Sequence, residues 1–138
     1  MSDSCAIDAA LIGALLADGA LMAKMPDGVF IDMASPGAER FVIISLLEAH
    51  DVDVFSGRAI EDALYLVKAV ALSSTGADVR GASARIDALL AEGALTAAGY
   101  ARVVTFRVER VRIIEVDEVD DSIRWDHRGG HYRVLGSL

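Results

Sequence analysis

The spacing of apolar residues predicts helices, a short strand and a loop in the first third of the chain. Ile7, Leu11 and Leu15 recur every four residues, so they lie on one face of a helix. Ser4 can cap this helix, which extends to about Leu16. After a break at Gly19, the pattern predicts a short helix over 20–25, a strand over 29–31 and a loop over 34–40 with a Pro-Gly turn.

A long strand is predicted over Arg40–His50. Its alternating positions are apolar on both faces, with Phe41 and Ile43 on one and Val42 and Ile44 on the other. A strand with two apolar faces is buried on both sides. We therefore expect the protein's own helices to cover one face and a neighbouring subunit to contribute to covering the other.

The next segments are a polar interruption and an ambiguous apolar stretch. His50–Arg58 breaks the apolar pattern and contains a Ser-Gly turn. The apolar residues of Ala59–Ser74 fit both helical and strand spacing, so the pattern leaves both open. We favour a strand, because a hairpin with the preceding strand would bury both.

The last third of the chain predicts a helix followed by strands. Thr75 and Asp78 form a capping-box-like pair at the helix start, and Gly93 can close the helix. Ala101–Val116 alternates as a strand, and its phase slips at Glu109–Arg110, which indicates a β-bulge. An acidic stretch over 115–121 follows this strand, and 130–138 is predicted to be a last short strand. The apolar stripe of the helix consists of Val79, Ala82, Ile86, Leu89 and Leu90.

This order of elements predicts the fold class. Helices and strands do not alternate as βαβ units, and no internal repeat marks a second domain. We expect an α+β fold in a single domain over 1–138, with a mostly antiparallel sheet and helices packed on one face.

Composition narrows the classes of function. The apolar fraction of 54% is high, which is typical of a chain that hides part of its surface in an oligomer. The net charge of −8 and the lack of a basic patch argue against a nucleic-acid-binding protein. A single cysteine, Cys5, excludes an internal disulfide. With no secretory signal and no membrane-spanning run, we expect a soluble intracellular protein that contacts no membrane.

The sequence contains no recognisable catalytic motif. Phosphate-binding loops, dinucleotide fingerprints, zinc-protease motifs and nucleophile elbows are all absent. Cys5 has no basic or histidine neighbour that would activate it. The acidic stretch lacks the ligand spacing and central glycine of a calcium loop, so we interpret it as a solvated loop. Its acidic residues are Glu115, Asp117, Glu118, Asp120 and Asp121.

The stretch "WDHRGGHYRV" concentrates histidines and arginines near the end of the chain. His127 and His131 are four residues apart, which in a strand separates them by roughly 13 Å, too far for one metal ion. The Gly129–Gly130 pair disfavours the helix that would bring them together. We therefore expect no metal and no cofactor, and interpret the glycines as a turn into the last strand.

The chain resembles the tail completion, or tail terminator, proteins of long-tailed bacteriophages. The likeness covers roughly residues 7–135 and rests on the order of segments. Its most specific parts are the Phe55–Arg58 turn, the helix over Ala77–Leu90 and the late "HRGGHYRV". One departure is the compact "ASPGAERF" loop, where such proteins often carry a longer, proline-richer stretch.

The resemblance implies a structural protein rather than an enzyme. Such proteins form a hexameric ring at the head-proximal end of the tail tube, where the ring stops tube polymerisation and joins tail to head. The implied partners are further copies of the chain, the tail tube protein and the head completion or connector proteins. Genomic DNA would pass through the channel without specific binding, which agrees with the acidic charge. The implied location is the neck of the virion, after assembly in the host cytoplasm.

Three alternatives stay open. One is another neck ring, such as a head completion or stopper protein; a second is a small metal-dependent hydrolase built on the histidines and the acidic stretch. The third is a small adaptor domain, since such modules leave no motif. As rim or subunit contacts of a ring we select Arg58, Glu115, Asp117, Glu118, Asp120, Asp121, Arg128 and His131.

Overall fold

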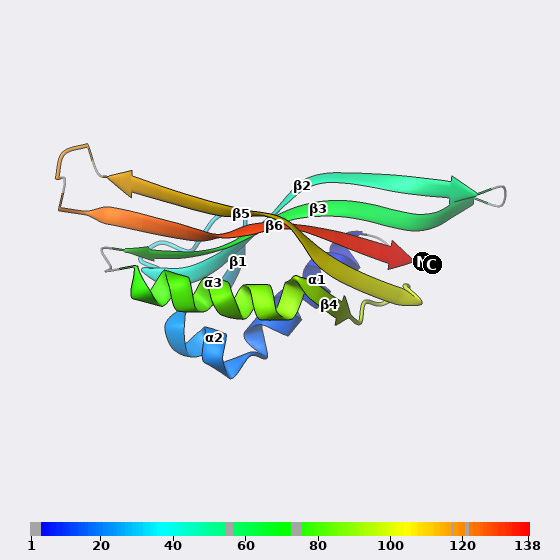
Figure 1. Cartoon of the computed structure of the whole chain (residues 1–138), viewed down its shortest axis with the longest axis horizontal. Helices are drawn as coiled ribbons and strands as arrows, with labels where there is room; N and C mark the ends of the chain where they lie inside the picture. Colours follow the sequence, from blue (N-terminus) through cyan, green and yellow to red (C-terminus); the bar gives the residue numbers. More distant parts are fainter. Residues whose placement is uncertain (1–3, 55–56, 73–75, 117, 121) are drawn as a thin grey trace.

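A single curved sheet dominates the computed structural model, which describes residues 4–54, 57–72, 76–116, 118–120 and 122–138. Within these residues the strands are ordered β1-β2-β3-β6-β5-β4, with the helices below the middle of the sheet (Figure 1). No helix of the described part is long and apolar enough to cross a membrane. The elements are α1 (Ser4–Leu16), α2 (Gly19–Lys24), β1 (Val29–Ile31), β2 (Arg40–Val54), β3 (Gly57–Leu72), α3 (Ala77–Leu90), β4 (Glu92–Leu95), β5 (Arg102–Val116) and β6 (Arg124–Ser137).

The predicted fold class, α+β with a mostly antiparallel sheet and helices packed on one face, is wrong. About half of the chain lies in strands, and these form a mixed half-barrel sheet with only small helices. The sheet is mixed because β1 pairs in parallel with β2. The prediction failed because the long strands extend past the apolar segments that revealed them, into polar stretches that resemble loops.

The N-terminal helices and the short strand are confirmed, although Ser4, the predicted cap of the first helix, is the first residue of that helix. α1 has the predicted bounds, and Ile7, Leu11 and Leu15 are fully buried along one face. α2 begins one residue before the predicted short helix, and β1 has the predicted range.

β2 and β3 form the predicted hairpin, which resolves the ambiguous stretch as a strand. Their antiparallel register continues from Arg40 opposite Ala71 to Val54 opposite Gly57. The sequence predicted that the strand would end at His50, and this is wrong, because β2 continues to Val54. The central turn residues, Phe55 and Ser56, lie outside the described residues.

α3 has the predicted apolar stripe but different ends. Its predicted cap, Thr75, lies outside the described residues. Gly76, whose φ of 84° is in the left-handed region, precedes the first helical residue, Ala77. Gly93 does not close the helix, because the chain leaves it at Leu90 and enters β4, which the sequence did not predict. Gly93 lies in β4 opposite Thr105 of β5.

β5 and β6 pair along their whole length, which corrects the prediction for the C-terminus. The predicted bulge is confirmed, with the register shift between Arg107 and Glu109. The last strand, however, begins at Arg124, and Gly129–Gly130 lies in its middle rather than in a turn. A Cβ atom on Gly129 would be 2.0 Å from the Val67 carbonyl oxygen, so the two glycines permit close packing of strands.

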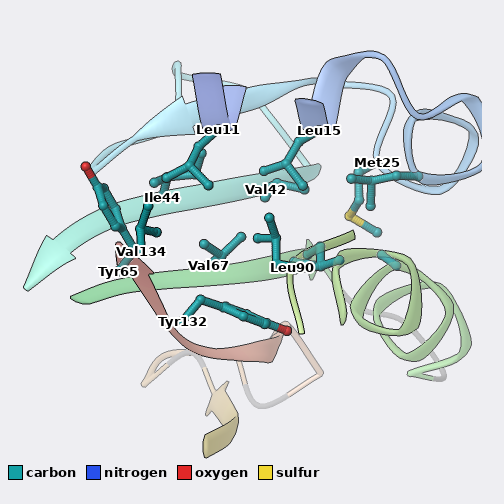
Figure 2. Packing of buried hydrophobic residues seen from close by; sticks show 14 of the residues in the cluster. Leu11, Leu15, Met25, Val42, Ile44, Tyr65, Val67, Leu90, Tyr132 and Val134 are labelled. Atoms are coloured by element: carbon teal, nitrogen blue, oxygen red, sulfur yellow. The ribbon is translucent and has the colours of Figure 1, made fainter. Parts of the chain in front are cut away.

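The main core joins the three helices to one face of the sheet. Figure 2 shows Leu11 and Leu15 of α1 above Val42 and Ile44 of β2, with Tyr132 on β6. Each fully buried aliphatic side chain of this kind stabilises the fold by roughly 1.5–3 kcal/mol. Residues from the first helix to the last strand therefore share a continuous core.

Polar contacts fasten the helices to the sheet and to each other. The Tyr65 hydroxyl donates to Asp8 of α1 at 2.5 Å, and burial of this phenol raises its pKa. Arg85 of α3 donates to both carboxylate oxygens of Asp18 at 2.9 and 3.1 Å. The Arg85 hydrogen bond lowers the pKa of Asp18, so the pair stays ionised at neutral pH.

The opposite face of the sheet has a smaller apolar cluster. Phe41, Ile43 and Val70 are buried there, and Trp125 packs with its ring centroid 6.0 Å from that of Phe41. The prediction that the strand from Arg40 is apolar on both faces is thus confirmed at its start.

Beyond the core, the sheet continues as two arms in opposite directions. The β2–β3 hairpin forms one arm and the β5–β6 hairpin forms the other (Figure 1). Side chains along the outer arms are exposed, including Val52 at 48% and Val116 at 51%.

The close packing at Gly129 gives a stability prediction. Gly129→Ala should destabilise the protein by about 1–3 kcal/mol or more, because the added methyl group meets backbone atoms that cannot rotate away. The matched control is Gly13→Ala in α1, where a Cβ has open space and alanine favours the helix. Urea unfolding of both variants measures this, and equal stability of Gly129→Ala and the parent would contradict the assignment.

Candidate functional site

A groove lined by arginines lies between α3 and the outer halves of β5 and β6. It consists of two adjoining hollows that share Arg80, Arg112 and Arg128. Arg124 lines the first hollow and Arg110 the second. We refer to these five residues as the arginine groove.

Strand register brings the arginines together. Arg112 of β5 lies directly opposite Arg128 of β6, so both project from the same face of the sheet. Arg110 shares that face by strand alternation, and Arg80 approaches from α3. Like charges directly opposite each other on antiparallel strands are destabilising. The fold thus places these like charges next to each other, although their repulsion does not stabilise the isolated chain.

Two carboxylates also line the groove, Asp126 in the first hollow and Asp87 in the second. Among the described residues, no carboxylate forms an ion pair with Arg80, Arg110, Arg112 or Arg128. Other arginines outside the groove do hold carboxylates: Arg85 with Asp18, Arg107 with Asp87 and Arg133 with Asp62.

An anionic partner suits such a groove. The chain as a whole has a net charge of −8, so the groove is a local group of positive side chains on an acidic protein. Guanidinium groups form planar, paired hydrogen bonds with carboxylates and phosphates. The site can therefore bind and orient an acidic group.

At its far end the groove is anchored to the core. The Asp87 carboxylate of α3 accepts from the Tyr132 hydroxyl at 3.0 Å and from Arg107 at 2.6 Å. Burial raises the pKa of Tyr132, which keeps its hydroxyl protonated as a donor. These bonds fix α3 against β5 and β6 and so set the width of the groove.

Two of the residues selected from the sequence lie near this region. Arg128 is half-buried in the groove. His131 is half-buried on the opposite face of β6, where its Nδ1 contacts the Glu109 carboxylate of β5.

The other selected residues lie at the tips of the two arms. Arg58 is in β3 opposite Asp53, near the end of the first arm. Glu115 is near the end of β5 in the second arm, and Glu118 lies in the loop beyond. Asp120 in that loop accepts hydrogen bonds from Ser122, which lower its pKa. Two further selected residues, Asp117 and Asp121, lie outside the described residues.

The two histidines of "WDHRGGHYRV" do not converge. Each contacts its own glutamate on β5, Glu115 for His127 and Glu109 for His131. No group of three or more His, Cys, Asp or Glu side chains within the described part of the chain could hold a metal ion.

Sequence reasoning missed most of the groove. It selected Arg128 but neither Arg110 nor Arg112, although "RVR" in a strand places both on one face. Arg80 could not be found this way, because only the packing of α3 brings it to the strands.

The comparisons with known proteins were made for sequence and for structure. No family model matches the sequence, and no curated protein is similar to it in sequence. One similar solved structure is a chain described as "Virion of native gene transfer agent (GTA) particle", with a TM-score of 0.74 and 19% identity. The match covers 98% of this chain and 97% of that chain.

The chain therefore shares its fold with a virion component. A second solved structure has a TM-score of 0.60 at 14% identity, over 100% of this chain and 97% of its own. At such identities the likeness concerns the fold. The resemblance to tail terminators in particular stays a prediction.

His127, on the face of β6 opposite Arg128, gives a pH-dependent prediction. Burial lowers its pKa, the positive charge of Lys68 lowers it further, and Glu115 and Asp126 act in the opposite direction. Glu115 lies 3.0 Å from Nε2, but no described group forms a hydrogen bond of good geometry with either ring nitrogen. Below about pH 6.5 the unfolded chain therefore binds a proton that the folded chain resists.

The parent should lose stability relative to His127→Gln as the pH falls below about 6.5, and the difference should be constant above it. Urea unfolding of both proteins between pH 5.5 and 7.5 measures this. His50→Gln, at an exposed histidine on the other arm, is the matched control. Parallel pH profiles for the parent and His127→Gln would contradict the assigned burial.

Proposed function

We propose that this chain is a structural protein of a phage-like virion, without enzymatic activity. The observation that carries the proposal is the fold shared with the gene transfer agent virion chain, at a TM-score of 0.74. The likeness extends over nearly all of both chains, so it concerns the whole arrangement rather than one common motif. The continuous core from α1 to β6 also supports a single domain over residues 1–138.

Within the virion, we propose a ring at the head-proximal end of the tail tube. The resemblance of the sequence to tail terminators supplies this position and the number of six subunits. Exposed apolar side chains on both arms support an oligomer, since monomers rarely expose so many close together. The partners would be further copies, the tail tube protein and the head completion or connector proteins, with DNA passing through the channel.

The arms suit contacts at the two rims of such a ring. Arg58 near one tip and Glu115, Glu118 and Asp120 near the other lie at opposite ends of the molecule (Figure 1). The arginine groove, including Arg128, would receive an acidic surface of a neighbouring protein. His131, on the other face of β6, would contribute to a subunit contact.

Removing the chain from the producing cells should give tails of irregular length that are not joined to heads. The reason is that the proposed ring both ends tube polymerisation and offers the surface for the head. Negative-stain electron microscopy of the lysate measures tube lengths and joining, and supplying the parent chain from a plasmid is the control.

The same experiment separates the second candidate, a head completion or stopper ring. That function predicts tails of uniform length that remain separate from filled heads. Fully joined particles with normal tails in the absence of the chain would contradict both neck functions.

A further inference from the structure

The sheet has two long open edges in the described part of the chain. The short strand β1 covers β2 only as far as Ile44, so Ser45–Val54 has no neighbouring strand on that side. Similarly, β4 covers β5 only as far as Phe106, and Val108–Val116 is open beyond the bulge. The two open segments are of similar length and belong to different arms.

Both edges are apolar to a degree that is unusual for exposed strands. On β5, Val108, Ile113 and Val116 are exposed to 50%, 43% and 51%. On β2, Leu46 and Val52 are exposed to 43% and 48%. Long apolar edges with unpaired backbone groups readily pair with another strand.

The two edges carry opposite charges on the face of the sheet that α3 covers. There the β5 edge carries Arg110 and Arg112, which belong to the arginine groove and have no carboxylate partner among the described residues. The β2 edge carries Asp51 on this face. The acidic residues on the other face of the two edges are Glu109 and Glu115 of β5 and Glu48 and Asp53 of β2. On the α3 face two β5 edges would repel each other, whereas one β5 edge and one β2 edge would attract.

Arg112 and Asp51 lie on the same face of the sheet. Arg112 is on the face that α3 covers, because it lines the groove with Arg80. Asp51 lies opposite Glu61, which alternates with the buried core residues Ala63 and Tyr65, so Asp51 is on that same face. If the sheet continued from one copy to the next, Asp51 of one would face the arginines of the other.

We propose that the open edge of β2 in one copy pairs with the open edge of β5 in the next copy. The occupant of each edge is thus a second copy of this chain, and the sheet runs on through the assembly. Since the two edges differ, the contact is head-to-tail, and such a contact forms a ring when the rotation from copy to copy closes. The inference rests on the proposed ring and names the surfaces that build it.

Charge reversal on one edge tests the pairing. One variant carries Arg110→Glu and Arg112→Glu, and the other carries Asp51→Lys. Each alone should need a concentration about tenfold or more higher than the parent to assemble, because its two edges then have the same sign on the face that α3 covers. Native mass spectrometry measures the assembly, and circular dichroism checks that each variant is folded.

Mixing the two variants restores opposite edges at every contact. The mixture should form closed rings with equal numbers of each variant, and the variant with all three substitutions should assemble alone. The matched control is Glu92→Lys with Arg102→Glu, which reverses exposed charges outside the open segments and should assemble like the parent.

If the parent assembles only on the tail tube, incorporation of the same variants into particles is measured instead. Incorporation that is unaffected by either charge reversal, or folded variants that do not recover on mixing, would overturn the edge pairing and leave the proposed function standing. Absence of the parent itself from purified particles would overturn the proposed function.

Discussion

The pairing of β6 with both of its neighbours is the interaction on which the rest of the structure depends. Through it, β1–β3 on one side and β5–β4 on the other become one sheet with one core. Gly129 and Gly130 allow this strand to approach the backbone of β3 and β5 more closely than any side chain would permit. The helices then need only cover the middle of the sheet, which is why they remain small.

The same pairing creates the features from which we argue function. Because β5 and β6 pair along their whole length, Arg112 lies opposite Arg128, and their charges meet those of Arg80 on α3. Long strands with short neighbours leave part of β2 and β5 open, with apolar side chains and, on the face that α3 covers, opposite charges. Each feature is unfavourable for an isolated monomer, and each becomes favourable when a complementary surface covers it.

Local signals in the sequence were sufficient for part of this structure. The four-residue spacing of Ile7, Leu11 and Leu15 identified α1, and the phase slip at Glu109–Arg110 identified the bulge to within two residues. These features depend only on neighbouring residues, so one sequence contains them.

Features set by pairing between distant segments were not predictable in this way. Gly129–Gly130 looked like a turn because nothing local shows that Val67 and Lys68 pack against it. The polar ends of the long strands looked like loops, since their hydrogen bonds go to partner strands rather than to nearby residues. The arginine groove depends on strand pairing and on the packing of α3, neither of which is local in sequence. Of its residues, only Arg128 was selected from the sequence.

A reconstruction of the particle neck by cryo-electron microscopy at side-chain resolution tests the central claim most directly. The account predicts a closed ring of this chain in which Ser45–Val54 of one copy is hydrogen-bonded to Val108–Val116 of the next. Asp51 would then face Arg110 and Arg112 across each subunit boundary. A neck without this chain, or a ring in which both strand edges face solvent, would contradict it.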